Sequence, residues 1–145
     1  MSHNTPKVFD TTLQKTTLWL NDIREQMGWE DRQRAYSALR GVLHALRDRL
    51  IPDEAVHLGA QLPMLIRGFY YEGWHLAGKP LKYRHKDDFL DRVVKESPML
   101  AGPELERAIT AVFHVLETHV PGAEIDQVRQ QLPPEVRELW ALSAI

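Results

Sequence analysis

The tripeptide Gln-Leu-Pro occurs twice in this sequence, at residues 61–63 and again at residues 131–133. When the chain is shifted by seventy positions, residues 19–67 align without a gap onto residues 89–137. The identical pairs are Leu20 and Leu90, Ala38 and Ala108, Val42 and Val112, His44 and His114, Leu46 and Leu116, Glu54 and Glu124, Gln61 and Gln131, Leu62 and Leu132, Pro63 and Pro133, and Arg67 and Arg137. Similarity at a fixed period is typical of repeated structural units. The sequence therefore predicts one domain over residues 1–145, with two pseudo-symmetric copies joined by a connector at 68–88.

Apolar residues recur at three- and four-residue steps along the chain, which is the spacing of one buried helical face. The first such stripe contains Phe9, Leu13, Thr17, Leu20, Ile23 and Met27, and the second contains Leu39, Val42, Leu43, Leu46 and Leu50. No segment alternates as a half-buried strand does. We therefore expect an all-α fold with about four helices in each copy. Within the doubled tripeptide, Pro63 is expected to end one helix and start the next, and Gln61 and Gln131 to bond carbonyls freed at the two breaks.

The composition excludes several classes of protein. The chain has no cysteine, which rules out disulfides and thiolate chemistry and suits a reducing compartment. No window approaches the roughly 20 apolar residues that a membrane span needs. A net charge of −2 gives no global attraction to nucleic acid or to anionic lipid. The sequence predicts a cytoplasmic protein without membrane association, which binds nucleic acid only through a local patch.

Half of the twelve aromatic residues lie between Phe69 and Phe89. Either these rings pin the connector between the two copies, or they line a pocket for a ligand or a partner. In the same region, residues 79–86 combine three lysines, one arginine and one histidine with a tyrosine, a composition found in patches that contact phosphates. Aspartates at 87, 88 and 91 offset part of this charge. The candidate binding residues are Tyr70, Tyr71, Trp74, Lys82, Tyr83 and Arg84.

Two pairs of residues that include histidine could bind a metal or take part in catalysis. Glu54 and His57 have the Glu-x-x-His spacing of di-iron bundles, but that site needs the motif twice and the second copy has Gln127 at the histidine position. This substitution favours a solvated pair on a surface helix. His44 and His114 could meet near a pseudo-twofold axis as a metal or proton-transfer site, or each could pack at the edge of the core. We predict no cofactor, no metal and no catalytic residue.

Through the segment from Arg67 to Val93 together with the two Gln-Leu-Pro sequences, the chain resembles, over nearly its whole length, the bacterial family of conserved proteins called domain of unknown function 2267. The residues that carry the resemblance are Arg67, Tyr71, Gly73, Trp74, Pro80, Lys82, Arg84, Phe89 and Val93. The resemblance implies an all-α bacterial cytoplasmic domain and brings no catalytic residue with it.

We expect a helical module that binds a ligand, a protein partner or a second copy of itself. The alternatives are an enzyme or metal protein using His44 and His114, and a weak nucleic-acid binder using residues 79–86.

Overall fold

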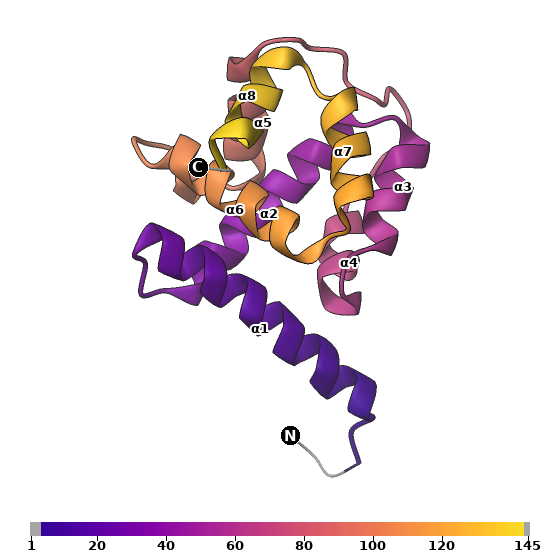
Figure 1. Ribbon diagram of the computed structural model, residues 1–145, viewed down its shortest axis with the longest axis vertical. Coiled ribbons are helices and arrows are strands. Elements are labelled where there is room, and N and C mark those ends of the chain that lie inside the picture. The colour runs from indigo at the N-terminus through magenta and orange to yellow at the C-terminus, as the bar shows by residue number, and fades with distance from the viewer. Residues whose placement is uncertain (1–3, 144–145) are drawn as a thin grey trace.

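The computed structural model describes residues 4–143, and over that range the chain is a single all-α domain without a strand (Figure 1). Its helices are α1 (Lys7–Met27), α2 (Arg32–Arg49), α3 (Pro52–Ala60), α4 (Met64–Tyr71), α5 (Lys86–Glu96), α6 (Leu105–His119), α7 (Gly122–Gln131) and α8 (Pro134–Ser143), and a short 3-10 turn, Pro98–Leu100, follows α5. No helix within this range is long and apolar enough to cross a bilayer.

Helix α2 forms the centre of the molecule and contacts α1, α3, α4, α5 and α6. Its predicted apolar stripe is confirmed, because Leu39, Leu43 and Leu46 have no exposed surface. The helix begins where the Asp31 carboxylate accepts a hydrogen bond from the backbone N–H of Gln33 at 2.8 Å, which satisfies one of the unpaired donors of the first turn. The fold is therefore organised around one helix that is covered on nearly every side.

The remaining helices pack in matching pairs around this centre. α4 packs on α2 and α8 packs on α6, while α1 packs against α6 and α5 packs against α2. α3 packs against α7. Helices α4 and α8 begin seventy positions apart, at Met64 and Pro134. An aromatic stack closes the second half of the core, in which the rings of Phe113 and Trp140 lie with centroids 4.1 Å apart.

The breaks that follow the two Gln-Leu sequences are held by arginine rather than by glutamine as predicted. Arg67 donates to the carbonyl oxygen of Leu62 at 2.9 Å, and Arg137 donates to that of Leu132 at 3.0 Å. The side chain of Gln131 instead accepts a hydrogen bond from the backbone N–H of Ile51 at 3.1 Å. Each arginine lies in the first turn of the helix that follows the break, so its side chain can reach back to the carbonyl. Its guanidinium also presents several N–H donors, whereas a glutamine amide presents two.

The predicted buried stripe of α1 is wrong in its first half, where Phe9 is 47% exposed and Leu13 is 42% exposed. The buried face consists of Thr12, Thr16, Trp19, Ile23 and Met27. The hydroxyl of Thr12 accepts a hydrogen bond from the backbone N–H of Leu65 at 2.8 Å, in the first turn of α4. That turn has no side-chain cap of its own at Pro63, so its N–H group needs an acceptor from elsewhere. This contact turns the threonines of α1 inward and Phe9 and Leu13 outward.

The irregular connector is shorter than predicted and covers residues 72–85, since residues 68–71 complete α4 and residues 86–88 begin α5. It is tied to the end of α2. The backbone N–H of Leu81 donates to the Asp48 carbonyl at 2.8 Å, and the Arg49 side chain donates to the Tyr83 carbonyl at 3.1 Å. The connector is therefore fixed to the central helix.

A buried ion network joins α2 to its neighbours. Arg47 and Asp48 are both almost fully buried and are paired at 3.0 Å, and Arg92 of α5 reaches the other Asp48 oxygen at 2.9 Å. The Arg47 guanidinium also donates to the carbonyls of Tyr70 and Glu72 at the end of α4. Removing one member would leave a buried charge without its partner, which is strongly destabilising.

We expect Asp48→Ala to lower the free energy of unfolding by about 3 to 5 kcal/mol, as measured by urea denaturation. The control is Arg107→Ala, whose exposed ion pair with Glu104 should contribute less than about 1 kcal/mol. Equal effects of the two substitutions would contradict the importance assigned to the buried network.

Candidate functional site

The four aromatic candidates lie at different depths. Tyr70 is fully buried and its hydroxyl donates to the Ala55 carbonyl at 2.5 Å, and burial raises its pKa. Tyr71 and Trp74 are half-buried, with ring centroids 5.5 Å apart. Tyr83 is also half-buried, and burial raises the pKa of its hydroxyl. Tyr70 thus presents no surface to a ligand, and the other three rings are partly covered by the protein itself.

The basic candidates Lys82 and Arg84 are exposed. The next two residues of the basic segment lie against acidic side chains of other helices. His85 Nδ1 is 3.0 Å from a carboxylate oxygen of Glu135, and the Lys86 amine is 2.8 Å from Glu106. Part of the charge of residues 79–86 is therefore compensated within the fold.

His44 and His114 lie in different surroundings. His44 is 1% exposed, and its Nε2–H donates to the Phe69 carbonyl at 2.6 Å while Nδ1 lies 3.3 Å from Glu96. Burial is the main cause that lowers the pKa of His44. His114 lies on an exposed position of α6. Because both ring nitrogens of His44 face protein groups, that imidazole has no nitrogen turned toward a metal or a substrate.

An apolar groove of about 490 Å³ lies between α1 and α4. Its walls are formed by Phe9, Thr12, Leu13, Met64, Leu65, Gly68, Phe69 and Glu72. The Thr12 hydroxyl is already bonded to the backbone of α4, and the other polar side chain of the wall, Glu72, is paired with Arg40 through one carboxylate oxygen at 3.0 Å. No sequence pattern predicts this groove, because Phe9 and Leu13 have the spacing of core residues.

Gly68 leaves the groove open on the α4 side. A methyl group placed on this residue would meet no other heavy atom within 4 Å. The apolar surface also continues past Met64, which lines a second hollow of about 510 Å³ together with Leu18. Leu18 is 53% exposed. The α1–α4 groove is thus part of a longer apolar face.

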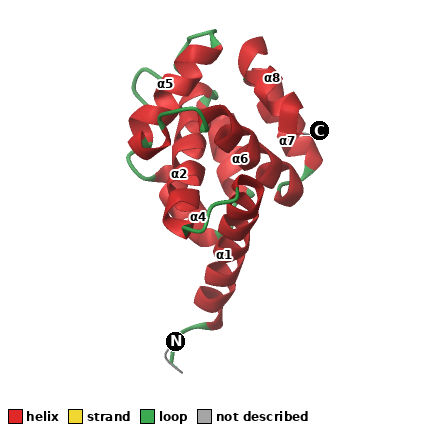
Figure 2. Ribbon diagram, turned by 90° about the vertical axis from the view of Figure 1, so that its left-hand side faces the viewer, coloured by secondary structure: helices red, strands yellow, loops and turns green. Residues whose placement is uncertain are grey.

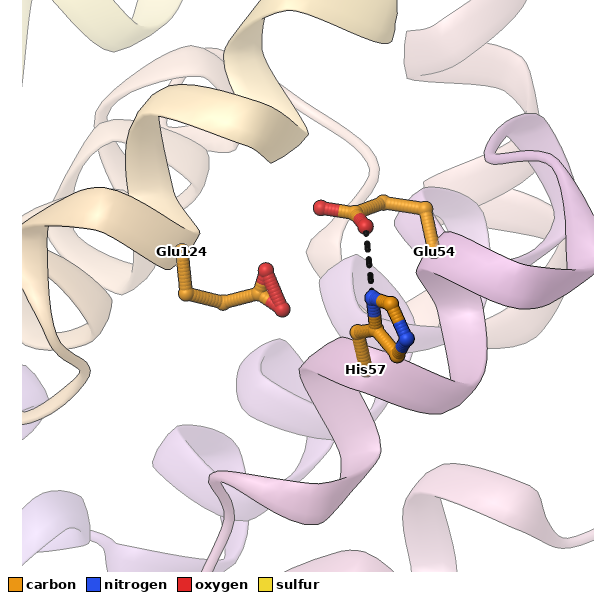
Figure 3. Close-up of side chains that lie close together, drawn as sticks. All are labelled: Glu54, His57 and Glu124. Atoms are coloured by element: carbon orange, nitrogen blue, oxygen red, sulfur yellow. Dashed lines mark ion pairs between the residues drawn. The ribbon is translucent and has the colours of Figure 1, made fainter.

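A separate cluster lies between α3 and α7, where Glu54, His57 and Glu124 point toward one another (Figure 3). His57 Nδ1 is 3.4 Å from a Glu54 oxygen, and one ligand atom from each residue lies within 4.8 Å of the others. Glu54 is not the solvated residue that the sequence predicts, because only 4% of it is exposed. Glu124 is 8% exposed. The register of the repeat aligned these two glutamates, but it gave no sign that α3 and α7 bring them together.

Burial and the neighbouring Glu54 raise the pKa of Glu124 from 4.5 to about 7. A carboxyl whose pKa is higher in the folded state stabilises the fold while it is protonated, and this stabilisation is lost as the pH rises toward the folded value.

Without added metal, we expect the free energy of unfolding of the natural protein to fall relative to Glu124→Gln as the pH rises from about 4.5 to above 7. The predicted difference at pH 8 is about 2 to 3 kcal/mol in favour of the variant, since glutamine needs no proton. Urea titrations at several pH values measure it. A difference that does not change with pH would contradict the raised pKa.

The comparisons with known proteins agree with the resemblance seen in the sequence. No curated protein matches the chain. Residues 16–139 match the family described as "Uncharacterized conserved protein (DUF2267)", a span that includes α2 to α7 and most of α1 and α8. This chain therefore belongs to the DUF2267 family of uncharacterized conserved proteins.

Proposed function

We propose that this chain is a helical interaction module of the bacterial cytoplasm, whose α1–α4 groove receives the apolar face of a partner helix. The observation that carries the proposal is the exposure of Phe9, Leu13 and Leu65 around an apolar groove. A contiguous exposed apolar surface with a polar surround is typical of an interaction site. The absence of cysteine is consistent with a reducing cytoplasm.

The position of α1 supports this proposal. The N-terminal end of the helix extends beyond the other helices, as both views show (Figures 1 and 2). Val8 and Phe9, each about half exposed, lie on this extension. An isolated stretch of helix is only marginally stable in water, and most helical stability in proteins comes from packing of an apolar face. A partner that covers this face would supply the packing that the chain itself does not.

The groove has the geometry for an amphipathic helix. It lies along two helices and is lined by apolar side chains, with Glu72 as a polar group on its wall. Helix-in-groove recognition uses apolar anchors on one side of the incoming helix, and polar groups at the rim fix its direction. Gly68 leaves room for one such anchor close to the α4 backbone.

The alternatives have less support. The enzyme alternative requires His44, whose ring nitrogens face Phe69 and Glu96. The nucleic-acid alternative requires the basic segment, in which His85 and Lys86 are paired with carboxylates. Of the aromatic candidates, Tyr70 is fully buried and the other three rings are partly covered.

We also propose that residues 19–67 and 89–137 are copies related by pseudo-twofold symmetry. The matched packing of α4 on α2 and of α8 on α6 supports this, as do the equivalent bonds of Arg67 and Arg137. The differing surroundings of His44 and His114 would then reflect divergence after duplication.

In an experimental structure, superposing residues 19–67 on residues 89–137 should bring the Cα atom of His44 onto that of His114. A superposition that pairs helices in a different order would contradict the duplication.

The interaction is tested by placing a photo-crosslinking amino acid at Leu65 and irradiating cells that produce the protein. We expect one discrete adduct, which should be lost when Gly68→Leu fills the groove. Gly68→Ala serves as the folding control, because it should stabilise α4 by about 0.5 to 1 kcal/mol and leave most of the groove open. Mass spectrometry of the adduct identifies the partner, including a second copy of this chain.

A matched probe at Arg107, which is exposed and distant in sequence from the groove, controls for random contact. The proposal is wrong if the Leu65 probe yields no adduct. It is also wrong if the adduct persists in Gly68→Leu or forms equally from position 107.

A further inference from the structure

The two carboxylates between α3 and α7 are unusual because they face each other in a buried position with atoms that lack partners. One oxygen of Glu54 and one oxygen of Glu124 are shielded from solvent and have no hydrogen-bond partner among the described residues. Both side chains are more than nine-tenths buried. Buried polar atoms in proteins nearly always have a partner, and an unpaired one indicates a missing proton, water or ion.

The third side chain of the cluster makes it more than an acidic pair. His57 is on the same face of α3 as Glu54, three residues later, and its imidazole is 65% exposed. In Figure 3 the ring lies beside the gap between the two carboxylates. Two carboxylates and one neutral imidazole are ligands that first-row transition ions accept together.

We infer that Glu54, His57 and Glu124 form a binding site for a divalent first-row transition metal ion, of which Zn²⁺ is the natural probe. Ligand atoms around a tetrahedral zinc ion lie about 3.4 Å apart, given bonds of about 2.1 Å. The His57–Glu54 pair already has that separation, at 3.4 Å. The remaining atoms lie within 4.8 Å and reach the ion by small side-chain rotations. This inference is independent of the α1–α4 groove.

The surroundings leave a coordination position open toward solvent. A cavity of about 320 Å³ is lined by His57, Glu124 and Gln127, with Gln61 and Pro121 at its edges. Three protein ligands with an open fourth position are typical of zinc sites that exchange a water or bind a further group, whereas structural sites are closed by four ligands. An ion held here would also join α3 to α7 and thus the first half of the chain to the second.

A substitution at Gln127 can test the site by raising its affinity for zinc. It lines the cavity three residues after Glu124, as His57 follows Glu54, and it is exposed. Gln127→His would add a second imidazole on the opposite helix without disturbing the core. Gln130→His is the matched control, because it places the same group on an exposed position of α7 that does not line the cavity.

The experiment is isothermal titration of the full chain with zinc at pH 7.5, after purification without a histidine tag and treatment with a chelator. We expect one ion per chain, weakened by at least about tenfold in Glu124→Gln and in His57→Ala, since even outer-shell partners of a metal contribute about 10- to 100-fold to affinity. Gln127→His should bind at least about tenfold more tightly than Gln130→His. Circular dichroism checks that each variant is folded.

The inference is overturned if the titration detects no zinc binding. It is equally overturned if Glu124→Gln and His57→Ala bind as the natural protein does, or if Gln127→His and Gln130→His are indistinguishable. In those cases the gap between the carboxylates holds a proton shared by the pair.

Discussion

The burial of α2 is the constraint on which the rest of the structure depends. Leu39, Leu43 and Leu46 lose all contact with solvent only because helices from both halves of the chain cover them. The hydrophobic effect rewards that burial, but the charged end of the same helix is also taken out of water. Arg47 and Asp48 are tolerated there because they pair with each other, with Arg92 and with carbonyls at the end of α4. The ion network thus links α4 and α5 to the central helix.

The way in which the first turn of α4 is capped helps to explain the surface that we propose as an interaction site. The first turn of α4 follows a proline that provides no side-chain acceptor, and Thr12 of α1 supplies one. A threonine that faces α4 turns the neighbouring leucine and phenylalanine of α1 toward solvent. This hydrogen bond and the buried Trp19 and Ile23 hold one face of α1 on the core, which leaves Phe9 and Leu13 exposed beside α4.

Much of the fold follows from the sequence alone, as the particular helices show. The stripe of α2 is visible as a local pattern, because its apolar residues recur at three- and four-residue steps. The inward face of α1 is not, because the stripe through Phe9 and Leu13 overlaps the stripe through Thr12 and Thr16. Apolar periodicity favours the first stripe, whereas a hydrogen bond to a helix far along the chain cannot be predicted from periodicity.

 This hydrogen bond joins Thr12 of α1 to Leu65 of α4, which are 53 positions apart in the sequence, and no local pattern reveals a contact of that range.

The cluster of Glu54, His57 and Glu124 could not be predicted from the sequence for a related reason. The repeat aligns Glu54 with Glu124, and the Glu-x-x-His spacing was visible, but the loss of histidine at Gln127 indicated that no complete site remained. Only the packing of α3 against α7 brings the second glutamate to the first. Alignment of two segments of a chain identifies matching positions, whereas their separation in space depends on how the helices pack.

The account rests on the claim that α1 is covered by the core along its C-terminal half and is covered on one side only along its N-terminal half. Hydrogen exchange of the dilute purified protein, followed by mass spectrometry, tests this claim most directly. Amides of residues 39–46 should exchange only through global unfolding, and amides of residues 8–15 should exchange many times faster through local opening. Equal protection of the two segments would contradict the account, because the first half of α1 would then be stable without a partner.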